Sequence, residues 1–333
     1  MRNTFRQYFS IPEPDLVELW QHGLFSFDAS VLLNIYGYSV ETRDELLNVI
    51  KRNAARIRLP HQFAIEYARN RHKVIIKQVS KYQEVERELE GIKRKYFEHK
   101  REHPYLTKKS LNAYCAIERE LEASRKKMEK LIGSDRYADL LLEVFEGKIG
   151  PAPNPEELSQ LCSDGEERFK KQIPPGFRDM KEKDSLDAYG DYIGWHQLMA
   201  IAQAEQKDFI LVIDDFKEDW WLLEHGRTIG PRPELRQEFT RVTQRQIHLY
   251  NSENFLRAAK KFNAADVSDE VIEEVTERLE SQREIQRVTN LKDVPSESLS
   301  HVTPASENKI KDELKSESPT EVEKSQAKQD LPK

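Results

Sequence analysis

The chain has 333 residues, of which 34% are charged and 38% hydrophobic, and its formal net charge is −6. This acidic balance excludes a general nucleic-acid coat but is compatible with a local basic surface. Two cysteines, Cys115 and Cys162, are too few for a disulfide framework or a cysteine-rich metal site, so a reducing cytoplasm is the expected compartment. No apolar run reaches the ~20 residues that a membrane helix needs, and we expect no membrane contact.

The first strong pattern is the apolar run over residues 24–27, which stops at Asp28 and is followed at once by helical spacing of Val31, Leu32 and Ile35. Such a run can be buried on both faces of a parallel sheet. Asp28 therefore stands where a strand passes into a helix. Taken alone, capping of that helix explains the aspartate as well as ligand binding does.

The next segment predicts a helix over residues 40–50, a strand over residues 56–59 that ends at Pro60, and a further helix from His61. This order of elements begins a parallel, doubly wound α/β sheet. Glu66 lies one to two turns into a helix that leaves a strand end, so it can face the same crevice as Asp28.

Residues 71–130 contain two series of apolar residues spaced by three and four, separated by His103 and Pro104. This spacing predicts two long helices in an antiparallel hairpin inserted into the α/β domain. The same residues include 17 Lys and Arg against 10 Asp and Glu. A solvated coiled coil explains this charge, and so does an arm that holds phosphates, a protein partner or a second copy of the chain.

The second half of the chain returns to the α/β pattern. After a Pro-rich loop with a short helix near residues 156–161, we expect a helix with Asp191 in its first turn and a strand that ends at Asp214 and Asp215. A helix, a strand, a helix and a charged helical stretch follow, over residues 234–243, 246–250, 252–262 and 269–287.

These patterns divide the chain into an α/β domain with an insertion and flanking segments. The predicted parts are an N-terminal segment 1–22, the two parts of the domain 23–70 and 148–262, the inserted hairpin 71–147, a charged helical segment 263–290 and a disordered tail 291–333.

Four acidic positions are predicted at strand ends or in the first turns of helices that follow strands: Asp28, Glu66, Asp191 and the pair Asp214/Asp215. Right-handed crossovers bring such positions to one edge of a parallel sheet. Carboxylates gathered there repel one another unless cations neutralise them, and oxygen ligands favour Mg²⁺ or Mn²⁺. Such a centre suits phosphoryl chemistry.

The chain resembles the PIN-domain nuclease superfamily, and its PIN-like bacterial branch with a helical insert. The resemblance covers roughly residues 22–260 and rests on these strings: Phe27-Asp28-Ala29-Ser30, Leu59-Pro60 with Glu66, Arg69-Asn70-Arg71, Pro174-Pro175-Gly176, Gly190-Asp191-Tyr192-Ile193-Gly194-Trp195 and Ile213-Asp214-Asp215-Phe216-Lys217-Glu218-Asp219-Trp220-Trp221. Ile213 stands where the family often has threonine.

The resemblance implies a PIN-like fold and a Mg²⁺- or Mn²⁺-dependent endoribonuclease. Its catalytic and metal-site acids carry over as Asp28, Glu66, Asp191 and Asp215, with Ser30 supporting the geometry of Asp28. Whether Asp214 or Asp215 faces inward depends on a one-residue register; we favour Asp215. Asp219 is a further candidate metal ligand.

Two other functions stay open at this stage. The first is a non-catalytic PIN-like module that binds a protein through the hairpin. The second is a structure-specific DNA nuclease, because no residue identifiable in the sequence reads a 2′-hydroxyl.

Overall fold

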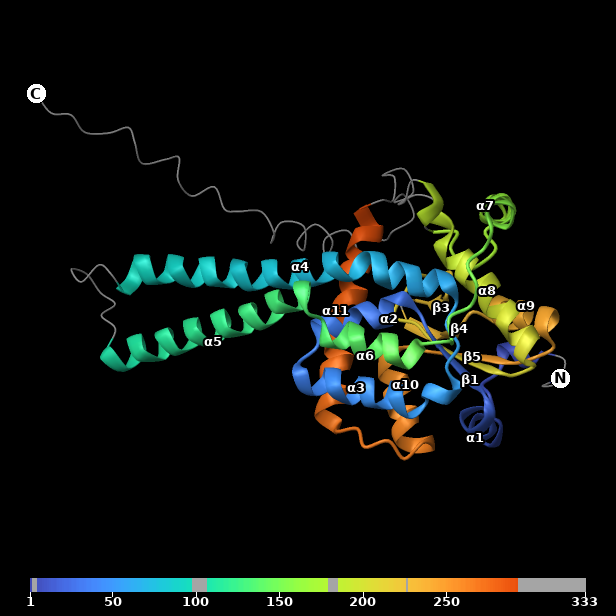
Figure 1. Cartoon of the computed structure of the whole chain (residues 1–333), viewed down its shortest axis with the longest axis horizontal. Coiled ribbons are helices and arrows are strands. Elements are labelled where there is room, and N and C mark those ends of the chain that lie inside the picture. The colour runs from blue at the N-terminus through green and yellow to red at the C-terminus, as the bar shows by residue number, and fades with distance from the viewer. Residues whose placement is uncertain (2–4, 98–106, 179–184, 226, 293–333) are drawn as a thin grey trace, which may run out of the picture. The chain divides into compact units, whose positions relative to one another are not determined.

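A parallel sheet of strands far apart in the sequence organises the α/β fold. In this computed structural model, which describes residues 1, 5–97, 107–178, 185–225 and 227–292, the strands β1 (Leu24–Phe27), β2 (Phe209–Val212) and β5 (Ile247–Tyr250) pair in parallel in the order β1-β2-β5. Figure 1 shows these elements among the surrounding helices. The α/β class predicted from the sequence is confirmed.

Single bridges widen the sheet beyond β1. Phe25 pairs in parallel with Ile57, and Leu59 pairs in parallel with Ile149. The strand expected over residues 56–59 is thus reduced to two bridges. The 3₁₀ turn Ala54–Arg56 occupies its beginning, and Pro60, whose ring carries no N–H, ends it.

Two further strands form a separate antiparallel pair that the sequence did not reveal. β3 (Trp221–Glu224) pairs with β4 (Arg227–Pro231), with an irregular register between Leu222 and Leu223. Both strands are short and β4 is largely exposed, so neither gives the long apolar run that predicts a buried strand.

The helices begin and end as follows: α1 Glu13–His22, α2 Ala29–Asn34, α3 Val40–Arg52, α4 His61–Ile92, α5 Lys108–Gly133, α6 Arg136–Phe145, α7 Pro155–Lys170, α8 Gly190–Glu205, α9 Pro233–Thr243, α10 Ser252–Phe262 and α11 Asp269–Lys292. Short helical turns occupy Arg6–Tyr8, Ile35–Gly37, Ala54–Arg56 and Ser185–Tyr189, and a π-helical turn occupies Lys93–Phe97.

Side-chain caps fix several of these helix starts. Asp28, Ser39, Thr107 and Asn251 each accept a hydrogen bond from a backbone N–H of the turn that follows. At Asn154 a reciprocal capping box with the third helical residue nucleates α7, which therefore runs well beyond the short helix expected near residues 156–161.

The two faces of the sheet are covered by different helices. Because successive residues of a strand point to opposite faces, Phe25 and Phe27 share one face, where Phe255 of α10 packs edge-on against both rings. Leu24 and its register partner Phe209 lie on the other face, where Phe239 of α9 meets Phe209. β1 and β2 therefore lie between buried aromatic side chains of α10 on one face and α9 on the other.

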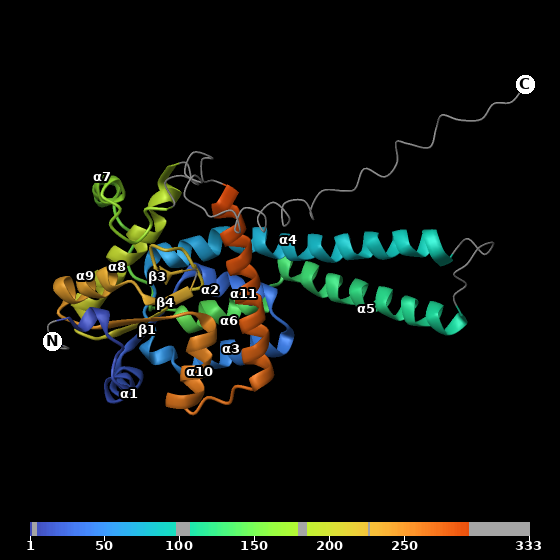
Figure 2. The ribbon, with the colours of Figure 1, turned by 180° about the vertical axis from the view of Figure 1, so that it is seen from behind.

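α4 and α5 lie side by side in antiparallel orientation, as Figures 1 and 2 both show. Two ion pairs cross between them, from Lys93 to Glu118 at 3.3 Å and from Arg125 to Glu86 at 3.0 Å. The connection at His103 and Pro104 lies outside the described residues. So does the predicted tail 291–333, except for residues 291 and 292, which belong to α11. It stays a prediction that this helix pair is an insertion and that the segments have the boundaries given above.

The chain divides into two units, Met1–Ser281 and Gln282–Lys333, and the end of α11 is the described part of the second. In the described part of the chain, no helix has the length and apolar character needed to cross a bilayer.

α8 crosses α4 at two glycines. A Cβ at Gly194 would lie 2.1 Å from the Phe63 ring of α4, and a Cβ at Gly190 would lie 2.3 Å from a carboxylate oxygen of Glu66. The backbones approach this closely only because both positions lack a side chain. The crossing brings the start of α8 against the first turns of α4.

We expect Gly194→Ala to lower the free energy of unfolding by about 1–3 kcal/mol, because the buried Phe63 ring has to move. Gly91→Ala, near the end of α4, is the matched control. Nothing lies within 4 Å of a Cβ at this position, and alanine stabilises a helix relative to glycine by up to about 1 kcal/mol. Urea denaturation of both variants measures the difference. Equal effects of the two substitutions would contradict the tight crossing.

Candidate active site

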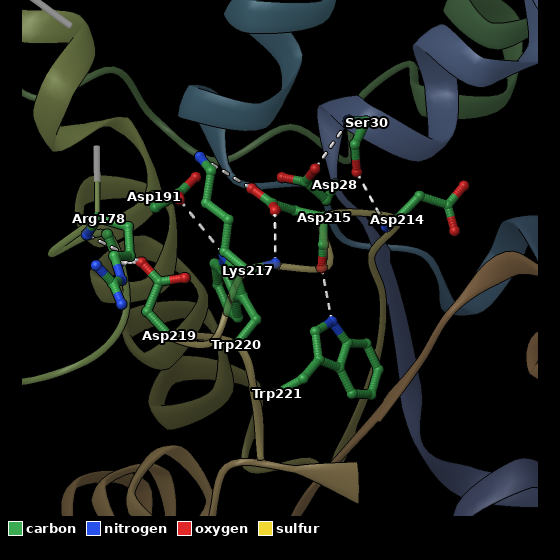
Figure 3. Close-up of polar contacts among 11 residues, drawn as sticks. Asp28, Ser30, Arg178, Asp191, Asp214, Asp215, Lys217, Asp219, Trp220 and Trp221 are labelled. Carbon is green, nitrogen blue, oxygen red and sulfur yellow. Dashed lines mark hydrogen bonds and ion pairs between the residues drawn. The ribbon is translucent and has the colours of Figure 1, made fainter. Parts of the chain in front are cut away.

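Two aspartates share one face of the sheet at the ends of adjacent strands. The register pairs Ser26 with Leu211 and Phe27 with Val212, so Asp28 and Asp215 continue on the same side, while Asp214 continues on the side of α10. Figure 3 shows the carboxyl groups of Asp28 and Asp215 directed into the same region and that of Asp214 directed away. Asp215, and not Asp214, therefore lies on the side of Asp28, and its role as a metal ligand stays a prediction.

Asp28 is a buried carboxyl group at the start of α2. Its Oδ2 accepts a hydrogen bond from the backbone N–H of Ser30 at 2.8 Å, and the side chain is 5% exposed. Burial raises the pKa of Asp28 to about 6, the hydrogen bonds from Ser30 oppose this rise, and the negative charge of Asp215 adds to it. Asp28 is thus both a helix cap and a destabilised negative charge.

Asp215 is held by the residue two positions further on. Its Oδ1 accepts a hydrogen bond from the backbone N–H of Lys217 at 3.0 Å, and its Oδ2 forms an ion pair with Nζ of Lys217 at 3.2 Å. The carbonyl oxygen of Asp215 accepts a hydrogen bond from the indole N–H of Trp221 at 2.6 Å. The strand end is therefore fixed from both its main chain and its side chain.

Asp191 and Glu66 reach the site from helices. Asp191 lies in the first turn of α8, where the helix N-terminus favours negative charge, and its Oδ2 accepts a hydrogen bond from the buried indole of Trp220 at 3.3 Å. Glu66 accepts a hydrogen bond from Gln62 at 2.6 Å and lies against Gly190, the residue before Asp191. The crossing of α4 and α8 therefore brings Glu66 and Asp191 near each other.

Asp214 ties the sheet to α10 and α2. Its carboxylate accepts hydrogen bonds from the backbone N–H and the hydroxyl of Ser252 at 2.8 and 2.7 Å, and from the amide of Asn34 at 2.9 Å. Its own N–H donates to the hydroxyl of Ser30 at 3.0 Å. Burial raises the pKa of Asp214, and these donors oppose the rise. Its observed contacts are structural.

Asp219 is fully buried and faces the loop before α8. Its Oδ2 accepts hydrogen bonds from the backbone N–H groups of Gly176 and Arg178, at 2.9 and 3.4 Å. A Cβ at Gly176 would lie 3.2 Å from Cβ of Asp191, so this loop packs directly against Asp191. Asp219 thus positions the wall of the site next to Asp191 (Figure 3).

The structure thus sorts the six predicted acids. Asp28 pairs with Asp215, Glu66 lies close to the start of α8 that carries Asp191, and Asp214 and Asp219 make structural contacts. Within the described ranges, no three His, Cys, Asp or Glu side chains form a group with the spacing of a metal site. The donors at this edge are carboxylate oxygens, which is the chemistry that suits Mg²⁺ or Mn²⁺.

The sequence did not reveal that Lys217, Trp220 and Trp221 contact aspartates of the site. Lys217 forms an ion pair with Asp215. Trp220 and Trp221 are buried, and their indole N–H groups donate to the carboxylate of Asp191 and to the main-chain carbonyl of Asp215. The available signal was general: a buried indole N–H usually finds an acceptor.

Comparison with known proteins gives one family match. Residues 24–235, more than half of the chain, match the model of a family described as a PIN-like domain. The matched range begins at the first residue of β1 and includes Asp28, Glu66, Asp191 and Asp215. No curated protein and no solved structure matches the chain.

We expect Asp28→Asn to stabilise the protein at pH 7.5 in EDTA by about 1–3 kcal/mol, because the amide keeps the cap without the buried charge. The raised pKa makes folding favour the protonated carboxyl, so wild type recovers its stability as the pH falls from about 6 toward 4. The stability difference between variant and wild type should therefore shrink over this window, which thermal denaturation across pH measures. A pH-independent difference would contradict it.

We expect Asp214→Ala to destabilise the protein by about 2–4 kcal/mol, because it leaves the buried donors of Ser252 and Asn34 without their acceptor. Asp215→Ala is the matched control, since the carboxylate of Asp215, unlike that of Asp214, does not hold the start of α10. Chemical denaturation in EDTA compares the two, and an equal loss in both would argue against the different roles of these aspartates.

Proposed function

The chain belongs to the PIN-like domain family, whose members are generally nucleases, and from this premise we propose that it is a Mg²⁺- or Mn²⁺-dependent endoribonuclease. The observation that carries the proposal is the pairing of Asp28 with Asp215 at the ends of adjacent parallel strands. A protein that brings two mutually repelling carboxylates together, one of them buried, gives up stability for them, which is typical of a functional site.

The residues of this edge fit a divalent cation by the chemistry of their donors. Asp28, Asp191 and Asp215 would hold the ion, and Glu66 would either contribute a further oxygen or orient the attacking water. When bound, the ion would lower the pKa of a water molecule and stabilise negative charge on the phosphate.

The surrounding residues keep these carboxylates in place. Ser30 fixes the Asp28 carboxylate through its N–H, and Trp220 and Trp221 donate to Asp191 and to the main chain of Asp215. Because the indoles are buried, the donors are oriented before any substrate arrives. Such preorganisation lowers the cost of arranging the site during the reaction.

The proposed substrate is RNA, with α4 and α5 supplying salt-sensitive phosphate contacts. The described parts of these helices retain the basic residues Lys73, Lys77, Lys81, Lys108 and Lys109. The same helices could instead bind a protein or a second copy of the chain. We place the reaction in the cytoplasm.

The test is cleavage of end-labelled single-stranded RNA, hairpin RNA and single-stranded DNA in Mn²⁺. We expect wild type to cleave RNA, and Asp28→Asn and Asp215→Asn to lower the rate by at least about 10²-fold, because each removes a charged ligand. EDTA should abolish the cleavage by wild type.

Asp164→Asn, which changes an aspartate on the surface of α7, is the matched control and should cleave like wild type. Full activity in Asp28→Asn or in EDTA would refute the metal-nuclease proposal. Cleavage of DNA alone would support the DNA nuclease. Absence of both cleavage and Mn²⁺ binding would favour the non-catalytic module.

A further inference from the structure

Lys217 places a cation against Asp215, one of the two paired carboxylates. The side chains of Lys217 and Asp215 are only 13% and 19% exposed, so their ion pair at 3.2 Å is largely shielded from water. The same residue also donates its backbone N–H to the other oxygen of Asp215 at 3.0 Å. Both oxygens of this carboxylate are therefore engaged by one residue (Figure 3).

The backbone that carries Lys217 is fixed. The carbonyl of Lys217 accepts hydrogen bonds from the N–H groups of Trp220 and Trp221, at 3.1 and 3.2 Å. The indole of Trp221 holds the carbonyl of Asp215, so both ends of this turn are anchored. A change in the position of the ammonium group therefore has to come from rotation of the lysine side chain, which needs no rearrangement of the main chain.

The ammonium group offsets part of the negative charge of Asp215. In a poorly hydrated site, a fixed positive charge weakens the binding of any other cation to the same oxygens. A divalent ion held by Asp215 would compete with Nζ of Lys217 for the negative charge of this carboxylate. The substrate of a nuclease brings a phosphodiester anion into this site, to which the displaced ammonium group can bind.

We propose that Lys217 is a built-in counter-cation of the Asp28–Asp215 pair, which a divalent ion displaces, and that the released ammonium group then binds the substrate phosphate. This inference rests on the proposed nuclease function. It assigns Lys217 two successive partners, a carboxylate before metal binding and a phosphate afterwards. Lys217 thereby links metal loading to substrate binding.

The test is calorimetric titration of the full chain with MnCl₂ in the absence of nucleic acid. Lys217→Met should lower the Kd for Mn²⁺ by about tenfold, because the competing charge is gone. Lys217→Arg keeps the charge and should stay within about twofold of wild type. Lys260→Met, which removes the surface ion pair with Asp269, is the matched control and should not change the Kd.

Cleavage of RNA provides the second readout. Lys217→Met should reach half-maximal activity at a lower Mn²⁺ concentration and yet have a maximal rate at least about tenfold below wild type, because the phosphate has lost its ammonium partner. A purely structural role for Lys217 would weaken metal binding and activity together.

The outcomes separate the two proposals. An unchanged or higher Kd for Mn²⁺ in Lys217→Met, with clear binding to wild type, would overturn the role of Lys217 and leave the nuclease proposal standing. Mn²⁺ that fails to bind wild type, or binds Asp28→Asn equally well, would overturn both proposals.

Discussion

The site is organised around the electrostatic repulsion between the carboxyl groups of Asp28 and Asp215. The parallel register of β1 and β2 sets their carboxyl groups on the same side of the sheet, where burial and mutual repulsion raise the pKa of Asp28. Neighbouring groups compensate this cost: the N–H of Ser30 and the main chain and ammonium group of Lys217. The positive charge of Lys217 therefore offsets part of this cost.

The surroundings of this pair explain the other acidic residues. Asp214 and Asp219 lie within a few residues of Asp215, yet both hold backbone N–H groups, the first at the start of α10 and the second in the loop beside Asp191. They are thus part of the frame that fixes the positions of Asp215 and Asp191. A cluster of acids in a sequence can therefore contain both functional and structural carboxylates.

Close packing of two helices also positions acidic residues near the site. Gly190 and Gly194 allow α8 to approach α4, which brings Glu66 next to the start of α8 and buries Phe63 between the two helices. The long continuation of α4 then pairs with α5 through ion pairs across the helix interface. One helix therefore contributes both to the proposed catalytic site and to the basic helix pair.

The sequence alone determined the α/β class, the ends of β1 and β2 at aspartates, and the family resemblance, because apolar runs and terminal carboxylates are local features. It also predicted helices in the place of α4 and α5 from their apolar spacing, but not that the helix beginning at His61 and the first helix of the hairpin are one continuous helix. The tertiary structure decided which of Asp214 and Asp215 faces the site, since a shift of one residue along β2 exchanges them. It likewise decided the pairing of Lys217 with Asp215, the structural role of Asp219 and the strand pair β3–β4, all of which depend on how a turn folds back on the sheet. No local pattern encodes these contacts, because each joins a short segment to a partner whose position the rest of the chain fixes.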